Sequence, residues 1–301
     1  MSTAPGGYYG RPVLKEPVWR PEVALYFFFG GLAGMSAVLA FAARVTGRDR
    51  LARGALLGAF AGVIACPPLL VLDLGRPERF LNMLRVLKPT SPMSIGSWIL
   101  VASGATISTA AASEVTGIAR PLGRAAEVLA ALLGLPLSVY AGVLLADTSI
   151  PAWHEARRHL PFLFGGSAAA SAGAAAAILT PAAAAGPARR LAVLGCVIEL
   201  LAARAQERRL GADARHYHGK LDRAAKLLTA SGGLLMALGG RRRPIAATAG
   251  AAILGGSLCE RFAVLAAGPR SARATAAGGT VRAPEEAAKT IRGRIDGLRR
   301  H

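Results

Sequence analysis

Eight apolar runs constrain this 301-residue chain more than any other feature of its sequence. A helix that crosses the hydrocarbon core of a bilayer needs about 20 mainly apolar residues. The fifth and sixth runs are rich in alanine, and the seventh is short and rich in glycine. The alternating pattern of a membrane β-barrel is absent, so we predict an all-α, polytopic membrane protein with about eight transmembrane helices. The runs lie at residues 22–44, 51–74, 95–116, 124–146, 160–180, 187–207, 226–240 and 244–267.

The composition agrees with a membrane-embedded chain. Hydrophobic residues make up 53% of it and charged residues 18%, against roughly 25% charged residues in a typical soluble domain. This apolar content excludes intrinsic disorder. The net charge of +19 is not arranged as a basic stripe interleaved with aromatic residues, so we expect no nucleic-acid partner. The cysteines form no CxxC pair, and we expect neither a metal site nor an iron–sulfur cluster held by this chain alone.

The connections between the runs alternate in charge. About 24 basic residues fall on the side that holds the N-terminus, and about 11, with Arg44 counted among them, fall on the opposite side. The positive-inside rule then places both termini in the cytoplasm. Residues 1–21 lack the order of a cleavable signal peptide, and we expect an interfacial segment there. It precedes a transmembrane domain at 22–267, and a basic tail at 268–301 follows, with anionic lipid headgroups as its natural contact.

Histidine is scarce in the apolar runs. All five histidines lie in connections or at the terminus, whereas a membrane cytochrome b needs histidine ligands on facing helices. We therefore expect no haem in this chain. His216 and His218 form a short His-x-His pair, which without a third ligand is a weak metal signal.

Ionisable residues inside the apolar runs are candidates for function, because burying charge in a membrane is costly. Asp73 ends the second run, Glu199 lies in the sixth, and Glu260 and Arg261 are adjacent in the eighth. One interpretation gives them proton or charge chemistry. The other is an internal ion pair, in which Arg261 neutralises Glu199 or Glu260 and holds helices together.

The connection at 75–94 has an unusually definite pattern. Gly75 breaks the second run, Pro77 suits the first turn of a new helix, and Pro89 stops it. Apolar residues share one face and basic residues lie off it, as in a helix that lies in the membrane interface. The alternative is an ordinary basic connection.

Several long motifs resemble those of the NrfD/PsrC family of respiratory membrane subunits. They are the segment Asp73–Trp98, the opening at 8–37, the segment Tyr140–Trp153, and Glu260-Arg261-Phe262 before Gly268. The first half of the chain is closely similar, whereas residues 165–250 match in hydropathy only. The resemblance implies eight helices in two four-helix bundles, without haem. It also implies a site for menaquinone or another quinone, in the inner (plasma) membrane. Its implied partners are a ferredoxin-like four-cluster iron–sulfur subunit and a molybdopterin catalytic subunit.

Candidate site residues follow from these motifs. Tyr140 can donate a hydrogen bond to a quinone oxygen, and Asp73 can exchange protons. Arg76 or Arg79 can stabilise negative charge on a reduced quinone oxygen. Trp98 offers apolar surface for the ring, as do residues 26–29.

Glu199 and Arg261 complete the predicted catalytic set with Asp73 and Tyr140. We expect the chain to be one part of a quinone-linked oxidoreductase and not an enzyme by itself. Two alternatives remain open at this point: a membrane anchor that never contacts quinone, and a secondary transporter. A transporter would need broken helices related by a repeat. Pro67-Pro68 and Pro136 are candidate breaks, but the second half has no counterpart.

The charge asymmetry gives a testable topology. Reporter fusions at His301 and within residues 47–51 should report opposite sides of the membrane, with His301 in the cytoplasm. Reports from the same side would show that the number of spans is wrong.

Overall fold

The computed structural model describes residues 17, 19–74, 84, 85 and 87–279 of the chain. All regular elements in this part are helical, which confirms the predicted fold class. Each predicted apolar run corresponds to one long helix. The helices are α1 (Pro21–Val45), α2 (Asp49–Leu74), α4 (Pro92–Thr116), α5 (Arg120–Ala146), α6 (Pro151–Glu155), α7 (Leu160–Leu179), α8 (Gly186–Leu210), α9 (Lys220–Gly239) and α10 (Arg243–Gly279), with a 3₁₀ helix at Gly211–His216.

Local sequence explains where these helices begin and end. Proline occupies one of the first two positions of α1, α4, α5, α6, α7 and α8, where its missing N–H leaves no bond unmade. The backbone N–H of Ser94 donates to Oγ of Ser91 at 3.4 Å and caps α4. Gly117 ends the same helix with φ at 73°, a conformation that glycine adopts without strain.

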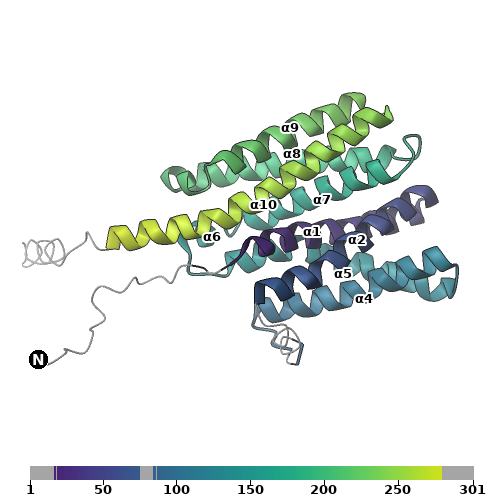
Figure 1. Cartoon of the computed structure of the whole chain (residues 1–301), viewed down its shortest axis with the longest axis horizontal. Coiled ribbons are helices and arrows are strands. Elements are labelled where there is room, and N and C mark those ends of the chain that lie inside the picture. Colours follow the sequence, from purple (N-terminus) through teal and green to yellow (C-terminus); the bar gives the residue numbers. More distant parts are fainter. Residues whose placement is uncertain (1–16, 18, 75–83, 86, 280–301) are drawn as a thin grey trace, which may run out of the picture.

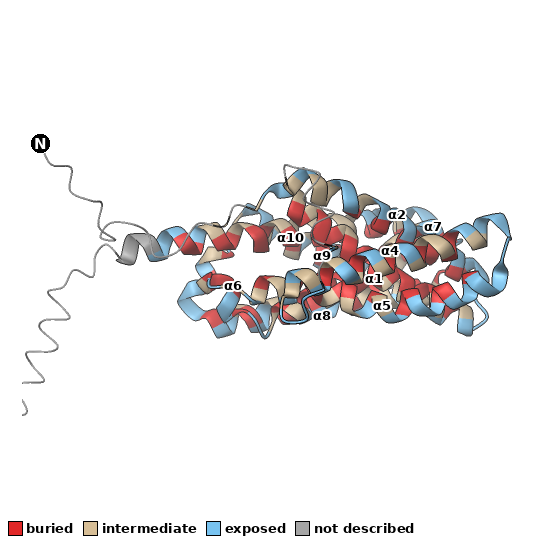
Figure 2. Cartoon of the chain, turned by 90° about the horizontal axis from the view of Figure 1, so that it is seen from below, coloured by how far each residue is buried: buried red, intermediate tan, exposed pale blue. Residues whose placement is uncertain are grey.

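The long helices form two four-helix groups that lie side by side (Figure 1). Helices α1, α2, α4 and α5 pack together as a first bundle, and α7, α8, α9 and α10 pack together as a second. The bundles meet mainly where α7 packs against α1 and α5. Buried residues face the interior and exposed residues line the outside of each helix (Figure 2). The expected pair of bundles is therefore present.

An aromatic contact joins the bundles at one end. Trp19, just before α1, stacks on Trp153 of α6 with ring centroids 5.3 Å apart. Nε1 of Trp153 donates to the carbonyl oxygen of Val264 in α10 at 2.8 Å. The starts of α1 and α7 therefore share one end of the molecule, and α2 and α8 both finish there.

Six of these helices are long and apolar enough to cross a membrane: α1, α2, α4, α5, α7 and α10. The sixth and seventh predicted spans are present as α8 and α9, but the charged residues along these two helices leave them outside that set. With 25 and 20 residues, they are still roughly 37 Å and 30 Å long. Helix α10 continues twelve residues beyond the expected end of the last span at 267 and finishes at Gly279.

Arg44 holds the first bundle together at the end opposite Trp19. Its guanidinium contacts Asp49 at 3.1 Å, Glu114 at 2.8 Å and Glu127 at 3.2 Å, so it joins α1, α2, α4 and α5. The side chains of Arg44 and Glu127 are 9% and 5% exposed. The basic-residue count treated Arg44 as a charge in a connection. In the structure it is instead paired with carboxylates of the bundle.

Replacing Arg44 with Gln should destabilise the protein, because it leaves the buried carboxylate of Glu127 and the partly buried one of Glu114 without a cation. We expect a loss of about 2 kcal/mol, equivalent to a thermal midpoint lower by about 4–8 °C for a chain of this size. The matched control is Arg53→Gln, since Arg53 is exposed on α2. Thermal unfolding of the purified chains measures both, and equal midpoints would contradict the role of Arg44.

Candidate functional site

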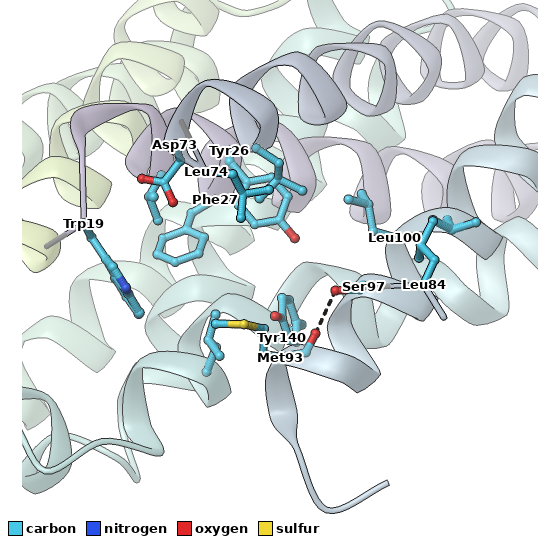
Figure 3. A pocket seen from close by; sticks show the side chains of 14 residues that line it. Trp19, Tyr26, Phe27, Asp73, Leu74, Leu84, Met93, Ser97, Leu100 and Tyr140 are labelled. Carbon is cyan, nitrogen blue, oxygen red and sulfur yellow. Dashed lines mark hydrogen bonds between the residues drawn. The ribbon is translucent and has the colours of Figure 1, made fainter. Parts of the chain in front are cut away.

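A cavity of about 100 Å³ opens at the Trp19 end of the first bundle, between α1, α2, α4 and α5. Its walls are mainly apolar. Figure 3 shows Asp73, Tyr26 and Phe27 on one side of it and Tyr140, Met93 and Ser97 on the other. An apolar cavity with a few convergent polar groups is the usual form of a small-molecule site.

Asp73 lies in the last turn of α2 and is half-buried at the edge of this cavity. The backbone N–H of Arg20 donates to its Oδ1 at 3.3 Å. The Arg20 guanidinium donates to the carbonyl oxygen of Leu72 at 3.5 Å, where it complements the free carbonyls at the end of α2. The approach to α1 thus fixes the Asp73 carboxylate beside the cavity.

Tyr140 reaches the same cavity from α5, so the structure brings together the two residues that the sequence favoured most. Its side chain lies against the backbone of Gly96 in α4. A Cβ atom at Gly96 would lie 1.8 Å from Cζ of Tyr140, so only glycine permits this position. The Tyr140 hydroxyl has no hydrogen-bond partner among the described residues, which leaves it available to a ligand.

Two further polar groups line the cavity. The hydroxyl of Tyr26 also lacks a partner within the described part of the chain, and the sequence had suggested this residue only as apolar surface. Ser97 donates its hydroxyl to the carbonyl oxygen of Met93 at 2.9 Å. Ser97 directly follows Gly96 in α4. Its position around the helix relative to Gly96 was the sequence signal that could have identified it.

Of the other predicted quinone-binding residues, Trp98 is the one that the described part of the chain includes. Trp98 is 39% exposed and does not line the cavity, because one residue along a helix turns the side chain away from the Ser97 position. Arg76 and Arg79 lie outside the described residues, together with most of the predicted interfacial helix.

Glu199 and Arg261 lie in the second bundle, apart from Asp73 and Tyr140. Arg261 is 1% exposed and pairs with Glu260 at 3.0 Å. It also donates to the carbonyl oxygen of Phe164 at 3.1 Å and lies over that ring at 3.7 Å. The hydroxyl of Thr229 donates to Glu199 at 3.4 Å. The predicted internal ion pair therefore exists, within α10, and the hydrogen bond from Arg261 to Phe164 ties α10 to α7.

A second, smaller cavity of about 40 Å³ adjoins this cluster. Glu199, Gln206 and Glu260 line it, and each has one buried side-chain oxygen with no partner among the described residues. At its outer edge Lys226 contacts both Glu207 and Asp222. Oxygen and nitrogen ligand atoms of Glu207, His218 and Asp222 lie within 4.8 Å of one another. His218 therefore meets carboxylates from α8 and α9, and not the His216 that the sequence paired with it.

Comparison with known proteins supports the resemblance seen in the motifs. The family described as polysulphide reductase NrfD matches residues 13–206, a range that runs from the approach to α1 through most of α8 and includes Asp73 and Tyr140. The motif at 260–268 lies beyond the matched range. No curated protein matches the chain. Because the match covers well over half of the chain, this multi-pass membrane protein belongs to the polysulphide reductase NrfD family.

Proposed function

We propose that the chain is the quinone-binding membrane subunit of a respiratory oxidoreductase complex. The observation that carries this proposal is the meeting of Asp73 and Tyr140, from α2 and α5, in one apolar cavity at the end of the first bundle. Members of the NrfD family are generally the quinone-interacting subunits of such complexes. Menaquinone or another exchangeable quinone is the ligand that we propose.

The residues of the cavity fit a quinone head group. Phe27 and Trp19 provide flat aromatic walls, and the hydroxyls of Tyr26 and Tyr140 are free to donate to ring oxygens. A bound quinone supplies redox chemistry in which electrons and protons are gained or lost at its ring oxygens. The apolar lining excludes water and strengthens the polar contacts inside the cavity.

Asp73 is the proton-exchanging group in this proposal. It is half-buried, so its carboxylate faces both the cavity and the membrane surface. Tyr140 orients the ligand, and Gly96 keeps the phenol in place. Each group holds a position before any ligand arrives, which is how binding sites reduce the entropic cost of orientation.

The electron partner is proposed to be an iron–sulfur subunit that docks at the same end. Arg85 and Lys88 lie in the connection between α2 and α4, and both are exposed. Arg76 and Arg79 belong to the same connection. A ferredoxin-like four-cluster subunit is commonly acidic, so charge complementarity would orient it. A molybdopterin subunit would complete the enzyme. We place the complex in the inner (plasma) membrane with both termini cytoplasmic.

A transporter is a weaker proposal. The candidate breaks at Pro67-Pro68 and Pro136 lie inside continuous helices, α2 and α5, whereas transporter sites of this kind use unwound segments near the midplane. The remaining alternative, an anchor without quinone turnover, is separated from our proposal by the following two experiments.

Asp73→Asn keeps the shape of the side chain and removes its exchangeable proton. We expect an assembled complex whose quinone reduction or quinol oxidation is lowered at least about tenfold, equivalent to about 1.4 kcal/mol of barrier. Asp147→Asn is the matched control, because Asp147 is exposed after α5 and does not line the cavity. Unchanged turnover in an assembled Asp73→Asn complex would favour the anchor.

Gly96→Ala should displace the Tyr140 ring, because the new methyl group would overlap it. We expect quinone KM to rise several-fold with assembly retained. Gly104→Ala in the same helix is the control, since a Cβ there would meet Val63 at an ordinary 3.7 Å. Equal kinetics in the two variants would show that Tyr140 has no part in binding.

A further inference from the structure

A groove between α8 and α9 opens at the end of the molecule opposite the quinone cavity. Its volume is about 560 Å³. Helix α8 packs mainly on α7 and α9 mainly on α10, so these two helices leave a space between them. Arg189, Arg190 and Arg241 line the outer part of the groove, and Val193, Leu194, Val197, Met236 and Ala237 line the inner part.

The three arginines have no anionic partner among the described residues. Arg189 donates to the carbonyl oxygen of Ala182 at 2.7 Å, and neither Arg190 nor Arg241 forms an ion pair in the described part of the chain. The carboxylates at this end of the first bundle are all bound to Arg44. The positive charge at the groove is therefore uncompensated within the described structure.

Helix stability does not explain these arginines. Arg189 and Arg190 are the fourth and fifth residues of α8, close to the helix N-terminus, where the helix dipole disfavours positive charge. The Arg189 side chain also lies directly against the next connection, because a Cβ atom at Gly240 would be 2.8 Å from its Cδ. A bound anion would offset the unfavourable position of both charges.

The inner part of the groove suits an acyl chain. From Arg190 to Val197, a distance of seven steps, α8 rises about 10 Å. Over that length the lining changes from guanidinium groups to aliphatic side chains, and Leu194 and Val197 are 55% and 47% exposed. This order, charged at the helix ends and apolar below them, is the order of a phospholipid in the bilayer.

A neighbouring cavity extends the charged part. Arg190 borders it together with Arg48 and Arg50 of the connection between α1 and α2 and the start of α2. Together the groove and this neighbouring cavity are lined by five arginines and one carboxylate, that of Asp49, which is bound to Arg44. Basic pockets between membrane helices are typical binding sites for anionic lipid headgroups.

We propose that the groove between α8 and α9 is a specific site for an anionic diacyl phospholipid. Arg189, Arg190 and Arg241 bind the headgroup phosphate, and one acyl chain lies along Val193, Leu194 and Val197. The lipid fills the space that α8 and α9 leave between them and joins the less apolar pair of helices to the bilayer. The site is independent of the quinone cavity, which lies at the other end of the first bundle.

The test compares lipid retention by the full-length chain purified in detergent, measured by native mass spectrometry. Dioleoyl phosphatidylglycerol and dioleoyl phosphatidylcholine are added in equal amounts. We expect the wild type to retain phosphatidylglycerol roughly tenfold more than phosphatidylcholine, as three converging arginines predict. The triple variant Arg189→Gln, Arg190→Gln and Arg241→Gln should lose this preference. The matched control is Arg53→Gln, Arg242→Gln and Arg243→Gln, which removes the same charge from exposed positions outside the groove and should keep it.

Further arms separate the possible sources of binding. Ala237→Leu narrows the groove at an exposed position without changing its charge and should also reduce phosphatidylglycerol retention. The single variant Arg241→Gln, in the exposed connection after α9, serves if the triple variant does not fold. An equal loss in the control triple would show that net surface charge alone attracts the lipid and would overturn the proposal. So would the absence of any preference in the wild type, or full displacement of the lipid by inorganic phosphate.

Discussion

Close approach of helix backbones at glycine is the constraint on which the rest of this structure depends. In a membrane the hydrophobic effect does not drive helices together, so packing must. Gly34 of α1 and Gly134 of α5 face each other so closely that a Cβ atom on Gly34 would lie 2.5 Å from the Gly134 carbonyl oxygen. Gly166 of α7 meets the backbone of Glu199 in the same way at 2.6 Å. These contacts fix both bundles. At the candidate site Gly96 likewise leaves room for a neighbour, here the side chain of Tyr140.

The two bundles use buried charge differently. The first has an apolar cavity of about 100 Å³ at one end and the Arg44 cluster at the other. The second keeps its ion pair, Glu260 with Arg261, in the interior, and no carboxylate of the described residues pairs with its arginines at the far end. Paired charge stabilises the fold from inside, whereas unpaired charge at a membrane surface recruits a counter-anion. The same residue type thus serves packing in one place and lipid contact in another.

Particular residues show how far sequence reasoning reached. Helix positions were predictable, because α1 at Pro21–Val45 and α7 at Leu160–Leu179 follow from apolar runs bounded by proline and turn residues. Asp73 was found because a carboxylate beside an apolar run is rare. Trp98 was predicted to line the site, but its neighbour Ser97 does so. The motif alone does not fix which of two adjacent helix residues faces inward. Arg44 was taken for a loop charge, because its partners come from three different helices.

The sequence by itself determined the fold class, the number of long helices and the family to which the chain belongs. Those properties depend on hydrophobicity and on motifs that are continuous along the chain. Only the tertiary structure decided that Asp73 and Tyr140 meet while Glu199 and Arg261 lie elsewhere. It also decided that Tyr26 and Ser97 line the same cavity as Asp73 and Tyr140, and that α8 and α9 leave a groove. Contacts between residues far apart in sequence depend on how helices rotate and pack, and that packing is set by the whole bundle at once.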